Sequence, residues 1–75
     1  MNLKNLKLIK EFLEIPIELS VSYGDDLNDF NWDSLAIINI QSFFLDHNGS
    51  EINPEELDEL KNIGDLDKFL SHNFK

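Results

Sequence analysis

The sequence predicts an all-α fold, a small four-helix bundle with a long connection between its first two helices. Four segments place apolar residues three or four positions apart, which is the helical period. The one segment that alternates strictly has no second segment to pair with. Pro16, Gly49 and Pro54 stand where such helices would end or begin. With only 75 residues, the chain is expected to form a single domain over residues 1–75.

The first predicted helix runs roughly from Leu3 to Leu13. Asn2 is a candidate N-cap, and Pro16 ends the helix because the residue before a proline is pushed out of the helical region. Three lysines occupy the polar side of this helix. The apolar face is made of residues at helical spacing, namely Leu3, Leu6, Leu8, Ile9, Phe12 and Leu13.

Residues 15–23 have the two-residue period of a half-buried strand. The alternating side chains are Ile15, Ile17, Leu19, Val21 and Tyr23. A lone strand would leave its backbone groups unpaired, so we expect a loop that pins every second side chain onto the helices. A turn should follow at residues 23–26, with Leu27 and Phe30 as further anchors.

The second helix is expected to begin at Asp33 or Ser34 and to end near His47. Asp33 is a good N-cap, and its charge suits the positive end of the helix dipole. Gly49 should end the helix in the left-handed conformation. Residues 35–45 are apolar around most of the circumference. Such a helix lies centrally among the others or presents an apolar surface to a partner.

The third helix should be short and has clear start signals. Asn53 is a candidate N-cap, Pro54 fits the first helical position, and Glu56 stands at the capping-box position. Leu57 and Leu60 should face inward.

The last helix is expected from about Ile63 to Phe74, with Asn62 as its cap and Asp65 in its first turn. Its buried stripe should contain Ile63, Leu66, Phe69, Leu70 and Phe74.

The composition is strongly acidic, with 15 Asp and Glu against 6 Lys and a net charge of -9. Such a surface repels nucleic acid and anionic lipid and attracts basic patches on proteins. It also keeps a small protein soluble, and we expect a monomer. No apolar run is long enough for membrane insertion, and the first residues lack the apolar core of a signal peptide, so the cytoplasm is the expected location.

Metal binding is not expected. There are no cysteines. Residues 46–51 match only the opening of a calcium loop, because Glu51 replaces the required Gly and Leu57 the required bidentate acid. His47 and His72 have neither partners nor spacing suited to zinc.

Catalysis is not expected either. Ser34, His72 and Asp33 supply the residue types of a hydrolase triad, but Asp33 adjoins the serine and the chain has no nucleophile elbow. The aromatic residues read mainly as core, which is clear for Phe44 and less clear for Trp32.

The Asp33-Ser34-Leu35 tripeptide is the strongest candidate site. It places a serine at the start of the second helix, after a long loop. Exposed amide groups and the helix dipole favour an anion such as a phosphodiester there. The simpler interpretation is that Asp33 is only an N-cap and Ser34 only a residue of the first turn.

Taken together, these motifs resemble those of the acyl carrier proteins over nearly the whole chain. The resemblance includes the tripeptide and the acidic and apolar segment that leads to it, residues 26–30. It also includes the turn and short helix at residues 49–56 and the last helix with its capping turn at residues 60–70. It implies an acyl-carrier-like four-helix bundle with three main helices, a short third helix and a long first loop.

The resemblance also implies a function. Ser34 would accept 4'-phosphopantetheine from coenzyme A through a phosphopantetheinyl transferase, with Asp33 presenting the serine and Leu35 completing the motif. The thiol of that group would carry an acyl chain as a thioester. The other partners would be acyl-loading and acyl-transfer enzymes, as in fatty acid biosynthesis.

By the same resemblance, partners would dock on and around the second helix, at Trp32, Ile37, Ile38, Gln41, Asp46, Glu55 and Glu56. The chain departs from the family in having Trp32 where a small residue is usual and few acids along that helix. More apolar partner contact and a carrier dedicated to one pathway are therefore expected. The alternatives are an aminoacyl or peptidyl carrier, and an unmodified acidic interaction module if the indole of Trp32 blocks the transferase.

Overall fold

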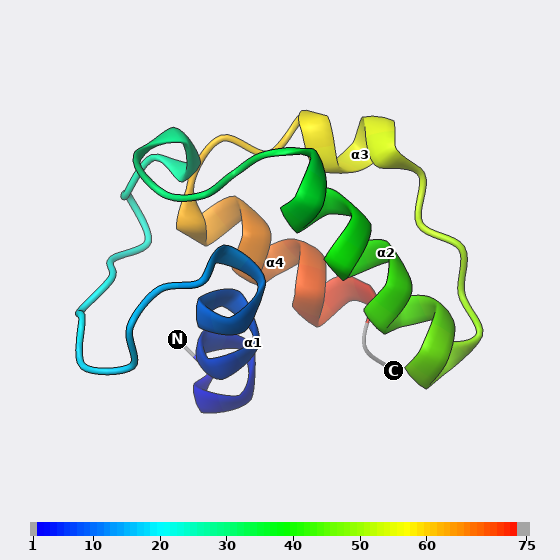
Figure 1. Ribbon diagram of the computed structural model, residues 1–75, viewed down its shortest axis with the longest axis horizontal. Helices are drawn as coiled ribbons and strands as arrows, with labels where there is room; N and C mark the ends of the chain where they lie inside the picture. Colours follow the sequence, from blue (N-terminus) through cyan, green and yellow to red (C-terminus); the bar gives the residue numbers. More distant parts are fainter. Residues whose placement is uncertain (1, 74–75) are drawn as a thin grey trace.

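The computed structural model describes residues 2–73, and within that range it contains helices but no strand. The α-helices are α1 (Leu3–Leu13), α2 (Ser34–Asn48), α3 (Pro54–Asp58) and α4 (Ile63–Asn73), and a single 3-10 turn, η1, spans Leu27–Asp29. α1 packs against both α2 and α4, and α3 packs against α2 (Figure 1). The predicted all-α class is confirmed for these residues.

The helix boundaries follow local capping signals. At each of the four α-helix starts, a side-chain oxygen accepts a backbone N–H group, as predicted. These bonds join Asn2 to Lys4 at 2.8 Å, Asp33 to Ala36 at 3.1 Å, Asn53 to Glu55 at 2.9 Å and Asn62 to Asp65 at 2.8 Å. Gly49 ends α2 in the left-handed conformation, with φ 65°. Glu14 ends α1 in the same conformation, with φ 55°, before Pro16 is reached. The predicted end of the last helix, Phe74, lies outside the described residues.

The core lies where α1, α2 and α4 meet. Its buried apolar residues are Ile9, Phe12, Leu13, Ile15, Leu27, Ala36, Ile40, Phe44, Ile52, Leu57, Ile63, Leu66 and Leu70. Phe44 is fully buried, as predicted, and its ring meets those of Phe43 and Phe69 edge to face at 5.7 and 6.1 Å. The prediction for Leu3 is wrong, because its side chain in the first turn of α1 is 74% exposed.

Among the residues that the structure describes, one buried residue is polar. Asn5 is 3% exposed, and its Nδ2 donates to Asp67 Oδ1 at 3.0 Å and to Ser71 Oγ at 2.8 Å. A buried amide must be hydrogen-bonded to be tolerated, so these bonds fix α1 against α4. Asn5 lay outside the predicted apolar stripe.

The connection between α1 and η1 is a loop, as expected, but its side chains do not pack as predicted. Ile15 is buried and Val21 half-buried, whereas Ile17, Leu19 and Tyr23 are 84, 49 and 49% exposed. The expected pinning of every second side chain is therefore wrong for those three residues.

The second half of this connection is held through its backbone instead. Leu27 N–H donates to the carbonyl of Lys61, Ile63 N–H to that of Asp25, and Gly64 N–H to that of Tyr23, at 3.0, 2.9 and 2.8 Å. Only one isolated antiparallel bridge, Asp26 with Asn62, results. The expectation that the segment has no backbone partner is thus corrected, because the start of α4 supplies one.

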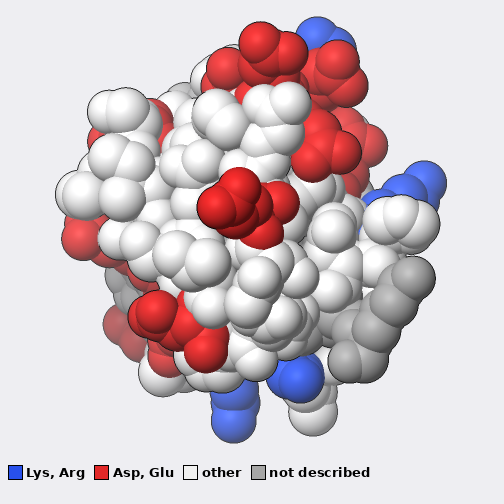
Figure 2. All heavy atoms as spheres, turned by 90° about the vertical axis from the view of Figure 1, so that its right-hand side faces the viewer, with Lys and Arg blue, Asp and Glu red and all other residues white. Residues whose placement is uncertain are grey.

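The acidic residues are densest in and next to α3, where Glu55, Glu56, Asp58 and Glu59 are exposed. On the side that holds the end of α2 and the connection to α3, acidic side chains gather along the upper edge, and others stand singly in an uncharged surface (Figure 2). Within the part of the chain that is described, no helix is long and apolar enough to cross a membrane.

Candidate functional site

Ser34 is the first residue of α2, and its side chain is exposed. The preceding Asp33 is extended, with φ -132° and ψ -175°, and its Oδ1 accepts the N–H of Ala36 at 3.1 Å. The first amide groups of a helix have no acceptor within the helix itself. Ser34 and Leu35 therefore offer a hydroxyl and two N–H groups at the positive end of α2.

Trp32 does not enclose Ser34. The indole is half-buried and packs against the core, while Ser34 remains exposed. The chain just before α2 is tied to α1, because Asn31 Nδ2 donates to the carbonyl of Leu13 at 2.9 Å. Trp32 thus contributes to packing, and the side chain of Ser34 stays exposed.

A small hollow of about 70 Å³ opens beside the serine, between the end of α1 and the start of α2. Its lining residues are Phe12, Glu14, Asn31, Asp33, Leu35, Ala36 and Asn39. Its ionisable lining residues are Glu14 and Asp33.

The alternative hydrolase triad is not assembled among the described residues. No hydrogen bond joins His72 to Asp33 or Ser34 there, and Asp33 serves as the cap of α2. His72 lines a different groove, with Glu56, Glu59, Leu60, Asp65, Lys68 and Phe69.

The predicted docking residues fall into two groups. Ile38, Asp46, Glu55 and Glu56 are exposed. Trp32, Ile37 and Gln41 are half-buried, the first two against the core, and Gln41 Nε2 donates to the carbonyl of Ile52 at 3.0 Å.

A groove of about 350 Å³ runs beside α2 where Gln41 holds the following connection. Its lining residues are Ile38, Gln41, Ser42, Leu45, Glu51 and Ile52. Leu45, which is 53% exposed, was missing from the predicted docking set. Its position on the same side of the helix as Ile38 is the signal that would have found it.

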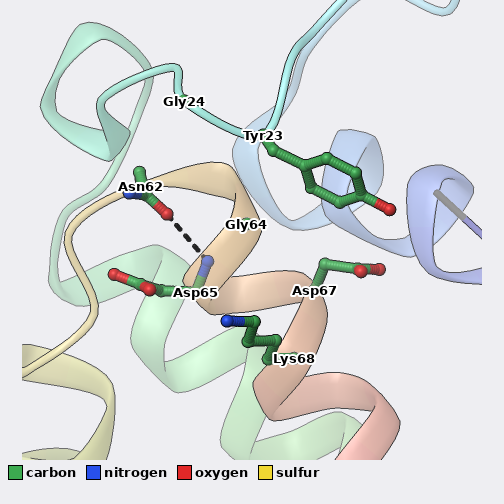
Figure 3. A pocket seen from close by; sticks show the side chains of 7 residues that line it. All are labelled: Tyr23, Gly24, Asn62, Gly64, Asp65, Asp67 and Lys68. Carbon is green, nitrogen blue, oxygen red and sulfur yellow. Dashed lines mark hydrogen bonds between the residues drawn. The ribbon is translucent and has the colours of Figure 1, made fainter.

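A larger hollow, of about 490 Å³, lies between the first connection and α4 (Figure 3). Tyr23 and Gly24 form one side, and Asp65, Asp67 and Lys68 on α4 the other. Both carboxylates already accept structural hydrogen bonds, from the N–H of Lys61 and the amide of Asn5. This hollow lies at the seam, the line of contact between the first connection and α4.

The described residues contain no group of three His, Cys, Asp or Glu side chains that could hold a metal ion. His47 stacks on the ring of Phe43, with centroids 4.1 Å apart, and its Nδ1 lies 3.0 Å from the Phe43 carbonyl oxygen. It thus packs at the end of α2.

No family model matches the chain, and no curated protein or solved structure matches it.

Proposed function

We propose that this protein is a carrier of the acyl-carrier type, which holds an acyl group as a thioester on 4'-phosphopantetheine attached to Ser34. The observation that carries the proposal is the exposed Ser34 hydroxyl at the first position of α2, directly after the capping Asp33. The motif resemblance over nearly the whole chain points to the same serine.

The residues around Ser34 suit a phosphodiester. The helix is 15 residues long, so its dipole is well developed at this end. The Asp33 carboxylate accepts the N–H of Ala36. The N–H groups of Ser34 and Leu35, which have no acceptor within the helix, are those left for phosphate oxygens. The attached group would supply a terminal thiol, which this cysteine-free chain lacks.

Attachment needs one displacement at phosphorus. The Ser34 oxygen attacks the pantetheine-bearing phosphorus of coenzyme A. The bond between that phosphorus and the departing 3',5'-ADP breaks, and the serine proton passes to a base. In this proposal the transferase supplies that base.

The proposal includes an acyl-carrier-like fold for the bundle, action as a cytoplasmic monomer, and loading and transfer enzymes as partners. The small number of acids on α2 favours a carrier dedicated to one pathway. An aminoacyl or peptidyl carrier would use the same serine, and the identity of the bound thioester would distinguish the two.

The test is to incubate the purified protein with coenzyme A, Mg²⁺ and a broad-specificity phosphopantetheinyl transferase and to record its intact mass. We expect a gain of one phosphopantetheine. Ser34→Ala should gain none and keep its helical circular dichroism, whereas Ser20→Ala, at an exposed serine of the first connection, should be modified fully. A wild-type chain that stays unmodified with several transferases would overturn the proposal.

A second candidate, an interaction module that is never modified, is favoured by the apolar outer face of α2. Leu35, Ile38 and Leu45 are each more than half exposed, at 56, 54 and 53%. The intact mass of the protein isolated from its native source separates the two candidates. The module predicts the bare chain, and the carrier predicts the modified one.

A further inference from the structure

A groove of about 460 Å³ lies between α1 and the start of the first connection. Its apolar lining is wholly aliphatic and consists of Leu3, Leu6, Ile15 and Ile17. The fold leaves two of these side chains largely uncovered, since Leu3 is 74% and Ile17 84% exposed. A ligand that covered them would remove apolar surface from water, which is favourable.

The charged lining of this groove is mainly basic. Lys7 and Lys10 line it together with one acid, Glu11, whereas the nearby Glu14 and Glu18 do not. The first ten residues contain three lysines and no acid, although the whole chain has a net charge of -9. In Figure 1, α1 lies at the bottom of the molecule and α3, with its acidic residues, at the top. The groove is therefore a locally basic part of an acidic protein.

The ammonium group of Lys10 is held in place beside the aliphatic lining. Its Nζ donates to the carbonyl oxygen of Ile17 at 2.6 Å, so the side chain reaches from α1 to the first connection. A lysine ammonium has three N–H donors. The Ile17 carbonyl takes one of them, which leaves two for the carboxylate of a ligand. Because this bond already orders the side chain, binding an anion there costs less conformational entropy.

We infer that this groove binds a free, unbranched fatty carboxylate, with the alkyl chain against the four aliphatic residues and the carboxylate at Lys10. Charge complementarity selects an anionic head group over a neutral one. The volume is typical of a small-molecule site, whereas stable docking of a protein needs a much larger surface. Ser34 does not line the groove, so the inference is independent of the carrier function.

The test is a titration of the isotope-labelled protein with sodium decanoate, followed by the NMR signals of its backbone amides. We expect a Kd of about 1 mM or below, with the largest shifts within residues 3–17. Octanoate, which is two CH₂ groups shorter, should bind about fourfold more weakly, because less apolar surface is covered. A neutral amphiphile of the same carbon number, 1,2-octanediol, should bind about fivefold more weakly than octanoate.

Four variants separate the two parts of the site. Lys10→Met keeps an apolar stem and removes the charge, so it should weaken octanoate about fivefold and leave 1,2-octanediol unchanged. Ile17→Ser should weaken both ligands by about threefold. The matched controls are Lys61→Met and Leu19→Ser, at an exposed lysine and at a leucine that is 49% exposed, neither of which lines the groove. They should change each Kd by less than about twofold, and circular dichroism should show that all variants are folded.

Saturable shifts within residues 3–17 that require both the charge of Lys10 and the alkyl chain support the site. Equal binding of octanoate and 1,2-octanediol, or shifts centred on interior residues such as Ile40 and Phe44, overturns it. A response to phosphatidylglycerol vesicles or to an acidic amphipathic peptide, but not to decanoate, also overturns it. Ser34→Ala should bind decanoate as the wild type does, and a loss of binding in that variant would contradict the inference. A wild-type chain that binds decanoate but is never modified would overturn the carrier function alone.

Discussion

At the scale of single residues, Asp33 is the N-cap of α2, and the sequence motif alone does not distinguish this structural role from a role in the modification of Ser34. Its Oδ1 accepts the N–H of Ala36 at 3.1 Å, and its carbonyl accepts that of Ile37 at 3.2 Å. It therefore fixes the start of α2 and, with it, the position of Ser34. The structural role of Asp33 and its role toward the transferase are therefore tested by two different substitutions.

We expect Asp33→Ala to lower the free energy of unfolding by about 1 kcal/mol, because Ala offers no acceptor for the capped amide. Asp33→Asn keeps an acceptor and should stay within about 0.5 kcal/mol of the wild type. Urea denaturation followed by circular dichroism measures both. If the charge also serves the transferase, Asp33→Asn slows the modification of Ser34 without loss of stability. Equal stability of all three proteins would show that the cap contributes nothing.

At the scale of elements, the first connection and the start of α4 form one unit. Three backbone hydrogen bonds join residues 23–27 to residues 61–64. Their closest approach is at Gly64, where an added Cβ would lie 3.1 Å from the Tyr23 carbonyl oxygen. That oxygen accepts the N–H of Gly64 itself at 2.8 Å, so it has little freedom to move away.

Gly64→Ala should therefore lower the free energy of unfolding, by about 1 kcal/mol, although alanine is favoured over glycine inside helices. Gly24→Ala is the matched control on the other side of the seam, because an added Cβ there meets nothing within 4 Å. It should leave stability unchanged or slightly raised, since it restricts the unfolded chain. Urea titrations of the two variants are to be compared. A Gly64→Ala protein as stable as Gly24→Ala would show that the seam can widen at no cost.

At the scale of the whole molecule, charge opposes compactness. With 15 acidic and 6 basic residues, like charges face one another across a molecule with extents of only 31 × 22 × 18 Å. The negative charge is densest around the short α3. Four exposed acidic residues lie in or next to this helix, namely Glu55, Glu56, Asp58 and Glu59. Asp58 is also at the C-terminal end of that helix, where a negative charge is unfavourable.

We expect the melting temperature to rise between about 10 and about 500 mM NaCl, because salt screens the repulsion. Asp58→Lys should raise the free energy of unfolding at low salt by a few tenths of a kcal/mol, and high salt should reduce the gain. Asp58→Asn, which removes the charge without reversing it, should give a smaller gain. Thermal melts at both salt concentrations measure these effects. A melting temperature that is independent of salt would contradict the argument.

What the sequence by itself determined are the features encoded within a few neighbouring residues. The start of α2 at Ser34 and its end before Gly49 follow from Asp33 and from the left-handed glycine, whatever the rest of the chain does. The same holds for the start of α3 at Pro54 after Asn53. Because the candidate site coincides with a helix start, its residue and its place at the positive end of α2 were predictable as well.

What only the tertiary structure decided are the features that need distant residues. The burial of Asn5 depends on Asp67 and Ser71, and the course of the first connection depends on the start of α4. Ile15 and Ile17 look alike in the alternating pattern, yet one is buried and the other is 84% exposed. Periodicity says which residues share a face, but the packing of the other helices decides which face is covered. For that reason, the half-buried position of Trp32 and the exposure of Leu35, Ile38 and Leu45 were decided only in three dimensions.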